Sequence, residues 1–287
     1  MPIRLIAMDI DGTLLDSQGK LREPNVTAIL RAAEAGVEIV LVTGRRFEFA
    51  RGVSDRIPCD LSLITSNGAV IKSKSGDTHQ RVLLPRDTAR AVLDAAVDFR
   101  PEAAVVFDRP HANQMVLEKI DWDDPVRGGY FRRNREHVAE VVPLTECFNG
   151  EDPVQVMFVG ACGRMRHAKS LLEALPIAPD FTLALTEYSE RNLAMLDVLR
   201  RGVSKATGLA EWARHRGIRR EEVMAIGDNF NDREMLAYAG LPIVMANCVP
   251  ELKSEGWEVT LSNDECGVAF AIQKHVLGIA SGAGVVR

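Results

Sequence analysis

A short apolar run near the start of the chain, Leu5-Ile6-Ala7-Met8, ends in Asp9-Ile10-Asp11-Gly12-Thr13, and this feature constrains the fold most strongly. The apolar run predicts a buried strand, and the residues after it predict a polar turn. Strands of parallel sheets are near-continuous apolar runs, and ligands bind beyond their carboxyl ends. Two carboxylates and a glycine at that point therefore indicate a functional site, with aspartates that merely cap a helix as the structural alternative.

The same pattern returns further along the chain. Apolar runs at 37–42, 61–64 and 223–226 end respectively in Thr43-Gly44-Arg45, Thr65-Ser66-Asn67-Gly68 and Gly227-Asp228-Asn229-Phe230-Asn231-Asp232. Segments with helical periodicity follow, at 24–36, 47–53, 206–217 and 233–240, and two more strand-like runs lie at 241–245 and 259–261. Alternating strand and helix signals predict an α/β fold with a Rossmann-like parallel sheet.

The pattern changes between residues 84 and 190. This segment has helix-like stretches at 87–99 and 165–175 and strand-like stretches at 103–107, 154–159 and 181–185. A hundred-residue interruption with its own helices and strands predicts an inserted α+β domain. We therefore expect residues 1–83 and 191–287 to form one core domain around an inserted domain at 84–190, with a loose tail at 281–284.

Charge and cysteine content limit the partners and the cellular location that we expect for the protein. The 35 basic and 40 acidic residues give a net charge of -5, which argues against a nucleic-acid or anionic-membrane partner. The first residues lack the apolar centre of a signal peptide, and no run approaches the ~18 apolar residues of a membrane span. The five cysteines are scattered without a C-x-x-C pair, as expected of reduced thiols in a cytoplasmic protein. The sequence does not indicate an oligomeric state.

The strand-end residues predict a phosphate site that needs a cation. A phosphate ester carries about two negative charges, and Asp9, Asp11 and Asp228 add up to three more, against one positive charge from Lys205. A hard divalent ion is therefore required, and carboxylate, carbonyl and water ligands favour Mg²⁺. Lys205 precedes a helical segment, where free N–H groups favour phosphoryl oxygens. An ordinary turn is the structural alternative at Asn67-Gly68. Arg45 and Arg46 either reach a substrate from the strand end or form surface ion pairs, which are the commoner outcome for arginine.

These motifs, together with Gly202-Val203-Ser204-Lys205, resemble in residues and order those of the haloacid dehalogenase-like phosphatases, specifically the Cof-type hydrolases. The resemblance covers roughly residues 1–83 and 191–276, and the inserted segment matches in position and size. Two positions differ from the family pattern. Ala206 stands where glycine is common, and Cys266 stands where aspartate is common.

The resemblance implies specific catalytic roles. Asp9 would attack phosphorus and become phosphorylated. Asp11 would protonate the leaving alcohol and then take a proton from the hydrolytic water. The carboxylates of Asp9 and Asp228 and the main-chain carbonyl of Asp11 would hold Mg²⁺.

It also implies how the substrate is held. Thr43, Gly44 and Lys205 would bind the phosphoryl oxygens. Asn67 and Asn231 would bind substrate, and Asp232 would support the site by orienting the metal, its waters or Lys205. The inserted domain would be the family's α/β cap, which excludes water and contacts the leaving group.

The predicted function is therefore a Mg²⁺-dependent phosphatase acting on a small phosphorylated metabolite such as a sugar phosphate. Two alternatives stay open. A phosphomutase or other phosphotransferase could pass the same aspartyl-phosphate to a hydroxyl group. A regulator could bind a sugar phosphate without turning it over.

Overall fold

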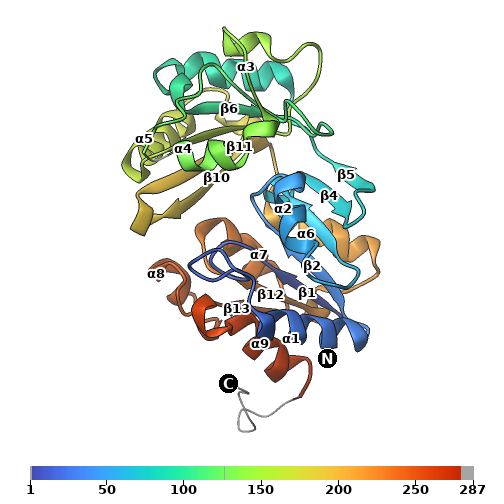
Figure 1. Cartoon of the computed structure of the whole chain (residues 1–287). Helices are drawn as coiled ribbons and strands as arrows, with labels where there is room; N and C mark the ends of the chain where they lie inside the picture. Colours follow the sequence, from blue (N-terminus) through green and yellow to red (C-terminus); the bar gives the residue numbers. More distant parts are fainter. Residues whose placement is uncertain (1, 126, 279–287) are drawn as a thin grey trace. The chain divides into compact units, whose positions relative to one another are not determined.

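The computed structural model describes residues 2–125 and 127–278, and the chain forms two compact units (Figure 1). Unit 1 comprises the chain up to Gln80 and from Ser204 onward, and unit 2 comprises Arg81–Val203. The tail at 281–284 lies outside the described residues. In the described part of the chain, no helix combines the length and the apolar character needed to cross a membrane.

Unit 1 is built on an eight-stranded sheet with the order β14-β13-β12-β1-β2-β3-β4-β5. The strands from β14 to β3 run parallel to their neighbours, and β4 runs antiparallel to β3. The strands are β1 (Leu5–Met8), β2 (Glu38–Val42), β3 (Ser62–Thr65), β4 (Val70–Ser73), β5 (Thr78–Arg81), β12 (Val223–Gly227), β13 (Leu241–Val244) and β14 (Glu258–Val259). The central strand β1 is buried along its whole length, as its apolar sequence predicts.

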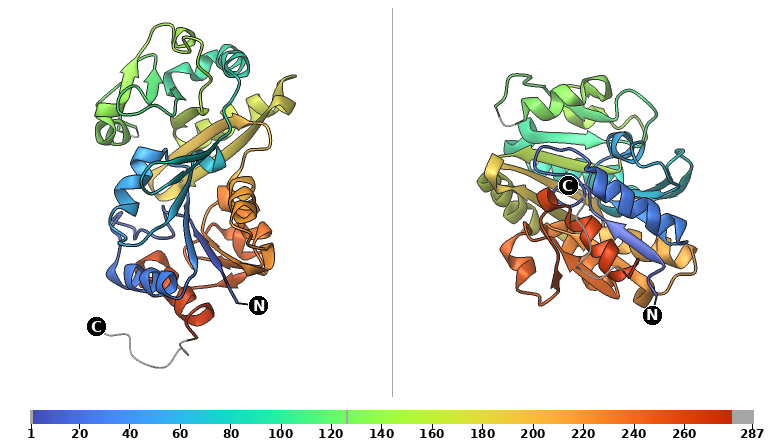
Figure 2. Two further views of the ribbon diagram at one scale, coloured as in Figure 1. Left: turned by 90° about the vertical axis from the view of Figure 1, so that its right-hand side faces the viewer. Right: turned by 60° about the horizontal axis from the view of Figure 1, so that its bottom comes forward.

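Helices cover both faces of this sheet (Figure 2, left). One face packs against α1 (Glu23–Glu34), α2 (Phe47–Ser54) and α9 (Gly267–His275). The other packs against α6 (Lys205–His215), α7 (Arg233–Tyr238) and α8 (Pro250–Lys253). Alternate residues of the strands enter the two apolar layers, so each strand is buried on both sides. The predicted fold class, a Rossmann-like parallel sheet with an inserted α+β segment, is confirmed.

Unit 2 is built on a six-stranded sheet with the order β10-β11-β9-β6-β7-β8, in which only β7 and β8 pair in parallel. The strands are β6 (Ala103–Val106), β7 (Met115–Leu117), β8 (Val138–Glu140), β9 (Gln155–Gly160), β10 (Phe181–Tyr188) and β11 (Leu193–Arg200). Helices α3 (Arg86–Ala95) and α5 (Cys162–Glu173) pack on one face, and α4 (Gly128–Arg133) packs on the other.

Strand β11 lies beyond the boundary that the sequence analysis placed at residue 190. It pairs antiparallel with both β9 and β10, so the segment up to Val203 belongs to unit 2. Leu196 and Val198 alternate with Asp197, so one side chain in two enters the apolar layer beneath α3 and α5.

Candidate active site

The predicted site residues follow the carboxyl ends of neighbouring parallel strands in unit 1. Asp9 follows β1, Asp228 follows β12 and Thr43 follows β2. The register Met8↔Ile226 and Met8↔Leu41 brings these three ends level at one edge of the sheet. The sheet therefore gathers carboxylates that lie more than 200 residues apart in the sequence.

Lys205 joins two of these carboxylates. Its Nζ lies 2.6 Å from Oδ1 of Asp9 and 2.6 Å from Oδ1 of Asp232, and all three side chains are buried. Helix α6 begins at Lys205, with Ser204 as its N-cap in a capping box with Thr207. Alanine at position 206 therefore leaves the helix start beneath Lys205 in place.

Three further donors hold the side chains of Asp228 and Asp232. Thr13 donates a hydrogen bond from Oγ1 to Oδ1 of Asp228 at 2.8 Å. Oδ2 of Asp232 accepts the backbone N–H groups of Asp228 and Asn229, each at 3.0 Å. Gly12 has φ +85°, and a Cβ at this position would overlap the Asp228 carboxylate. Only glycine fits this close approach.

The cluster carries more negative than positive charge. Burial raises the pKa of Asp9 to about 7, because Lys205 offsets only part of the desolvation and of the repulsion from Asp232 and Asp11. Burial, together with the charges of Asp9 and Asp232, raises the pKa of Asp228 well above its usual range. Burial alone would lower the pKa of Lys205, but Asp232 and Asp9 outweigh it and raise this pKa.

Asp11 is held apart from this cluster. Its carboxylate accepts two hydrogen bonds from Arg45, at 2.7 Å from Nε to Oδ2 and at 2.6 Å from Nη2 to Oδ1. Both side chains are only partly buried. Asp9 and Asp11 are thus only two residues apart in the sequence, but Lys205 holds Asp9 and Arg45 holds Asp11.

The turns after β2 and β3 are joined to each other. The N–H of Asn67 donates to the carbonyl oxygen of Thr43 at 3.0 Å, and the side-chain amide of Asn231 donates to Oδ1 of Asn67 at 3.0 Å. Gly44 lies against Asn67, because a Cβ on Gly44 would be 3.2 Å from Oδ1 of Asn67. Ser66, Asn67 and Gly68 all have positive φ.

Gly68 also sets the position of Lys205. It has φ +103°, and a Cβ there would overlap the carbonyl of Ser204. A larger residue at position 68 would therefore push the start of α6 away from the strand ends. The Asn-Gly pair at 67–68, which the sequence alone allows as an ordinary turn, supports the helix that carries Lys205.

The structure thus gathers Asp9, Asp228, Asp232 and Lys205 into one cluster and joins Thr43, Asn67 and Asn231 in a second. Sequence reasoning missed two residues. Thr13 holds Asp228, and its position in the Asp9–Thr13 motif was the available signal. Arg45 holds Asp11, where a surface ion pair was the alternative considered. The available signal was that Asp11 follows β1 and Arg45 follows β2, two strands that are parallel neighbours in the sheet.

The donor set fits a hard divalent cation. One ligand atom from each of Asp9, Asp228 and Asp232 lies within 4.8 Å of the others, and all three residues are buried. Among the residues that the structure describes, Oδ2 of Asp9 and Oδ2 of Asp228 have no hydrogen-bond donor, whereas both oxygens of Asp232 have donors. Unpaired carboxylate oxygens of buried aspartates are ligands of the kind that Mg²⁺ prefers.

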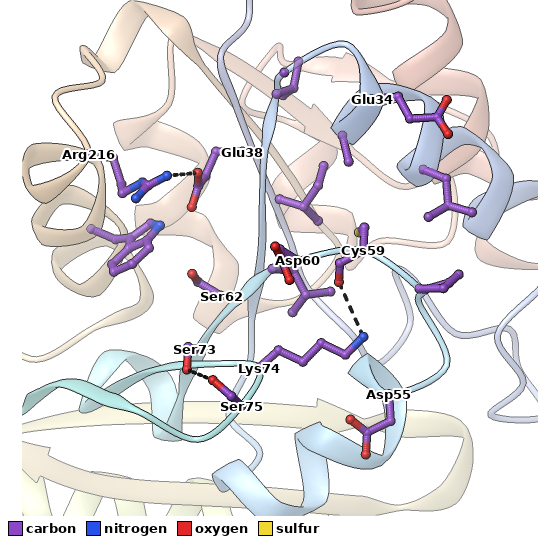
Figure 3. Close-up of a pocket in the computed structure, with 18 of the residues that line it drawn as sticks. Glu34, Glu38, Asp55, Cys59, Asp60, Ser62, Ser73, Lys74, Ser75 and Arg216 are labelled. Carbon is purple, nitrogen blue, oxygen red and sulfur yellow. Dashed lines mark hydrogen bonds and ion pairs between the residues drawn. The ribbon is translucent and has the colours of Figure 1, made fainter.

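A groove of about 990 Å³ lies at the other edge of the same sheet. Its lining includes Glu38, which begins β2, and Ser62, which begins β3, so it lies at the amino ends of these strands. Figure 3 shows Arg216 paired with Glu38 and Lys74 directed toward the carbonyl of Cys59. The groove is therefore separate from the clustered carboxylates.

A comparison with protein families identifies the chain. The model of the haloacid dehalogenase-like hydrolases matches residues 6–272. The chain belongs to this family. The resemblance to Cof-type enzymes inferred from the motifs is confirmed, and the predicted enzyme class, a haloacid dehalogenase-like phosphatase, is confirmed with it.

Several similar members of the family are phosphatases by name. The 5-amino-6-(5-phospho-D-ribitylamino)uracil phosphatase YcsE of Bacillus subtilis is 30% identical over 96% of this chain and 96% of its own. The HMP-PP phosphatase of Klebsiella pneumoniae is 30% identical over 88% of this chain and 87% of its own. A solved phosphatase of the haloalkanoate superfamily from Bacteroides thetaiotaomicron is 25% identical, with a TM-score of 0.77 over 97% of this chain and 96% of that one.

Proposed function

We propose that the enzyme hydrolyses a small phosphorylated metabolite such as a sugar phosphate, with Mg²⁺ as cofactor and Asp9 as the nucleophile. One observation carries this proposal. Lys205 holds the buried Asp9 carboxylate at the carboxyl edge of a parallel sheet, where two further buried aspartates converge. A structural salt bridge would need one carboxylate for one lysine, and this site has three.

The reaction needs two carboxyl groups in different protonation states, one ionised and one protonated. Asp9 attacks phosphorus through a carboxylate oxygen, and the bond from phosphorus to the ester oxygen breaks. Asp11 gives its proton to that oxygen, so the alcohol leaves uncharged. A water molecule then gives a proton to Asp11 and attacks the aspartyl-phosphate, which restores Asp9 and releases inorganic phosphate.

The cation would be held by the carboxylates of Asp9 and Asp228 and by the main-chain carbonyl of Asp11. When bound, it would offset the charge that the carboxylates and the phosphoryl group bring together. Asp232 would act as a supporting residue, because its oxygens already hold Lys205 and two backbone N–H groups.

The remaining residues would bind the phosphoryl group and its surroundings. Lys205 would stabilise the phosphoryl oxygens, together with the hydroxyl of Thr43 and the backbone at Gly44. Asn67 and Asn231 would contact the substrate through amide groups that the structure pairs with each other. Unit 2 would be the cap that provides contacts to the leaving group.

The substrate class is supported by the named relatives. YcsE is named for a phosphorylated ribityl compound, and the Klebsiella pneumoniae enzyme is named for HMP-PP. Both names describe small phosphorylated molecules. We extend that class to this enzyme, with no nucleic-acid or membrane partner, while the cytoplasmic location stays a prediction.

Phosphate release from a panel of phosphorylated sugars, nucleotides and cofactors tests the proposal. The panel is measured with and without Mg²⁺, and Asp9→Asn serves as the matched variant because amide and carboxylate have nearly the same size. We expect metal-dependent release by the native enzyme and a loss of at least about 10⁴-fold in kcat for Asp9→Asn.

Three outcomes would contradict the proposal. Normal turnover by folded Asp9→Asn would exclude the covalent step. Phosphoryl transfer from a sugar bisphosphate that outpaces phosphate release would identify a phosphotransferase instead. Tight binding without release from any ester would identify a regulator.

A further inference from the structure

Arg45 is built into the site more firmly than a surface arginine would be. Its guanidinium lies 4.6 Å from the ring centroid of Phe49, in the first turn of α2, and its Nη1 is 3.5 Å from the Phe49 carbonyl oxygen. Its own backbone is fixed as well, because its N–H donates to Oγ1 of Thr43 and its carbonyl accepts the N–H of Ser66. The cation is therefore oriented before any ligand binds.

This fixed cation holds both oxygens of Asp11. A two-bond arginine–carboxylate pair fixes the plane of the carboxylate as well as its distance. Lysine at this position would provide one point of contact and leave that plane free to rotate. The two neighbouring carboxylates are thereby set independently, Asp9 by Lys205 and Asp11 by Arg45.

We propose that Arg45 is a positioning residue that orients Asp11 for proton transfer to the leaving oxygen. The inference rests on the proposed function, because it assumes that Asp11 is the acid. In the first half of the reaction Asp11, protonated by the hydrolytic water of the preceding turnover, gives that proton to the ester oxygen as the bond from that oxygen to phosphorus breaks, and Arg45 pairs with the carboxylate that forms. Arg45 exchanges no proton in this step and acts by holding the carboxyl group of Asp11 in place.

A positioning role predicts a dependence on the leaving group. Phenyl phosphate and p-nitrophenyl phosphate share the phenyl ester skeleton and differ by one para nitro group. p-Nitrophenolate leaves readily as an anion, whereas phenolate is more basic and depends more on protonation by an acid. Losing an oriented acid should therefore slow phenyl phosphate more strongly. A direct contact between Arg45 and the phosphoryl group would instead slow both esters equally.

The experiment measures kcat/KM for both esters, with saturating Mg²⁺, in the native enzyme, Arg45→Gln, Arg45→Lys, Asp11→Asn and Arg45→Gln/Asp11→Asn. For a two-step reaction this ratio reports the steps up to release of the phenol. Arg51→Ala is the matched control, because Arg51 lies on α2, the helix that carries Phe49, and pairs at the surface with Glu48. Thermal melting of each variant shows that it is folded.

We expect Arg45→Gln to lower kcat/KM about 30- to 100-fold for phenyl phosphate and less than about 5-fold for p-nitrophenyl phosphate. Arg45→Lys should fall between the native enzyme and Arg45→Gln. The double variant should be no slower than Asp11→Asn, since Arg45 acts through Asp11. Arg51→Ala should match the native enzyme.

Equal losses for the two esters in Arg45→Gln, or a further loss in the double variant, would overturn the positioning role. Equal losses in Asp11→Asn would overturn the acid role of Asp11 and this proposal with it. Neither result would touch the nucleophile, which the Asp9→Asn measurement tests separately.

Discussion

In unit 1 the strands β12, β1, β2 and β3 run in one direction, whereas neighbouring strands of unit 2 mostly run in opposite directions. Parallel strands end at one edge, so Asp9 and Asp228 lie in the same cluster in unit 1. Antiparallel strands end at alternate edges, and the buried acids of unit 2 pair locally, Glu187 with Arg166 and Asp197 with Gln155.

The comparison between the two units distinguishes two roles of buried acidic side chains. The paired acid of unit 2 is neutralised by its own arginine, and we infer that its role is structural. The acids of unit 1 outnumber their lysine, which leaves a deficit of positive charge that a bound cation would offset. Three substitutions test this difference, ordered by the size of the expected effect.

Lys205→Met should have the largest effect. It removes the cation shared by two buried carboxylates and the proposed donor to the phosphoryl group, so kcat should fall by about 10²- to 10³-fold. The measurement is steady-state phosphate release by protein whose fold is verified by circular dichroism. Lys274→Met, which removes a surface pair with Glu258, is the control and should leave kcat unchanged. A loss below tenfold for Lys205→Met would mean that the cluster is structural.

Arg166→Met should destabilise unit 2 by about 2 kcal/mol, because it leaves the buried Glu187 carboxylate without its two-bond partner. Thermal or urea unfolding measures the loss. Adding Glu187→Gln should reverse most of it, since the uncompensated charge is then absent. If the double variant were as unstable as Arg166→Met, packing of the arginine stem would account for the effect.

Asp228→Asn should stabilise the metal-free protein at alkaline pH. The pKa of Asp9 is about 7 and that of Asp228 is also raised, whereas an unfolded aspartate titrates near 3.9. The contribution of such groups to the free energy of unfolding is fully present below pH ~4 and is lost as the pH rises through about 7. Removing one charge should therefore raise the melting temperature at pH 8 by about 3–6 °C and change it much less at pH 5.

Melting curves in excess chelator at the two pH values provide the measurement. In the Asp228→Asn variant, Thr13 can donate to the carbonyl oxygen of the side-chain amide as it does to the native carboxylate, so this hydrogen bond is kept. A lower melting temperature at pH 8 would show that the carboxylate charge is already compensated.

The parallel sheet of unit 1 could be predicted from the sequence because its signals are local. Each strand is a short apolar run, and each strand end carries polar residues at the point where the chain turns. Asp9, Asp228 and Asp232 were placed in one site for that reason, Lys205 was added because it precedes a helical segment, and the structure gathers all four. The site roles themselves stay proposals.

The parts that the sequence did not indicate depend on rotamers or on pairing across the sheet. Whether Arg45 extends into solvent or turns back to Asp11 is decided by the Phe49 ring and carbonyl, which lie one helical turn away. Strand β11 is recognised only through its partners β9 and β10, because Asp197 interrupts its apolar run. Such contacts between distant segments leave no signature in one short stretch of sequence.

The position of β1 at the centre of the sheet affects how the protein folds while it is being synthesised. β1 pairs with β2 early in the chain, but its other neighbour, β12, follows the whole of unit 2. The ion pair between Asp9 and Lys205 joins residues 196 positions apart. The entropic cost of closing a loop grows only slowly with its length, so the long separation adds little to the free-energy cost of folding. A nascent chain that ends before β12 nevertheless has only the β1–β5 part of the sheet, with an open edge at β1, so Asp9 and Asp228 come together only late in translation.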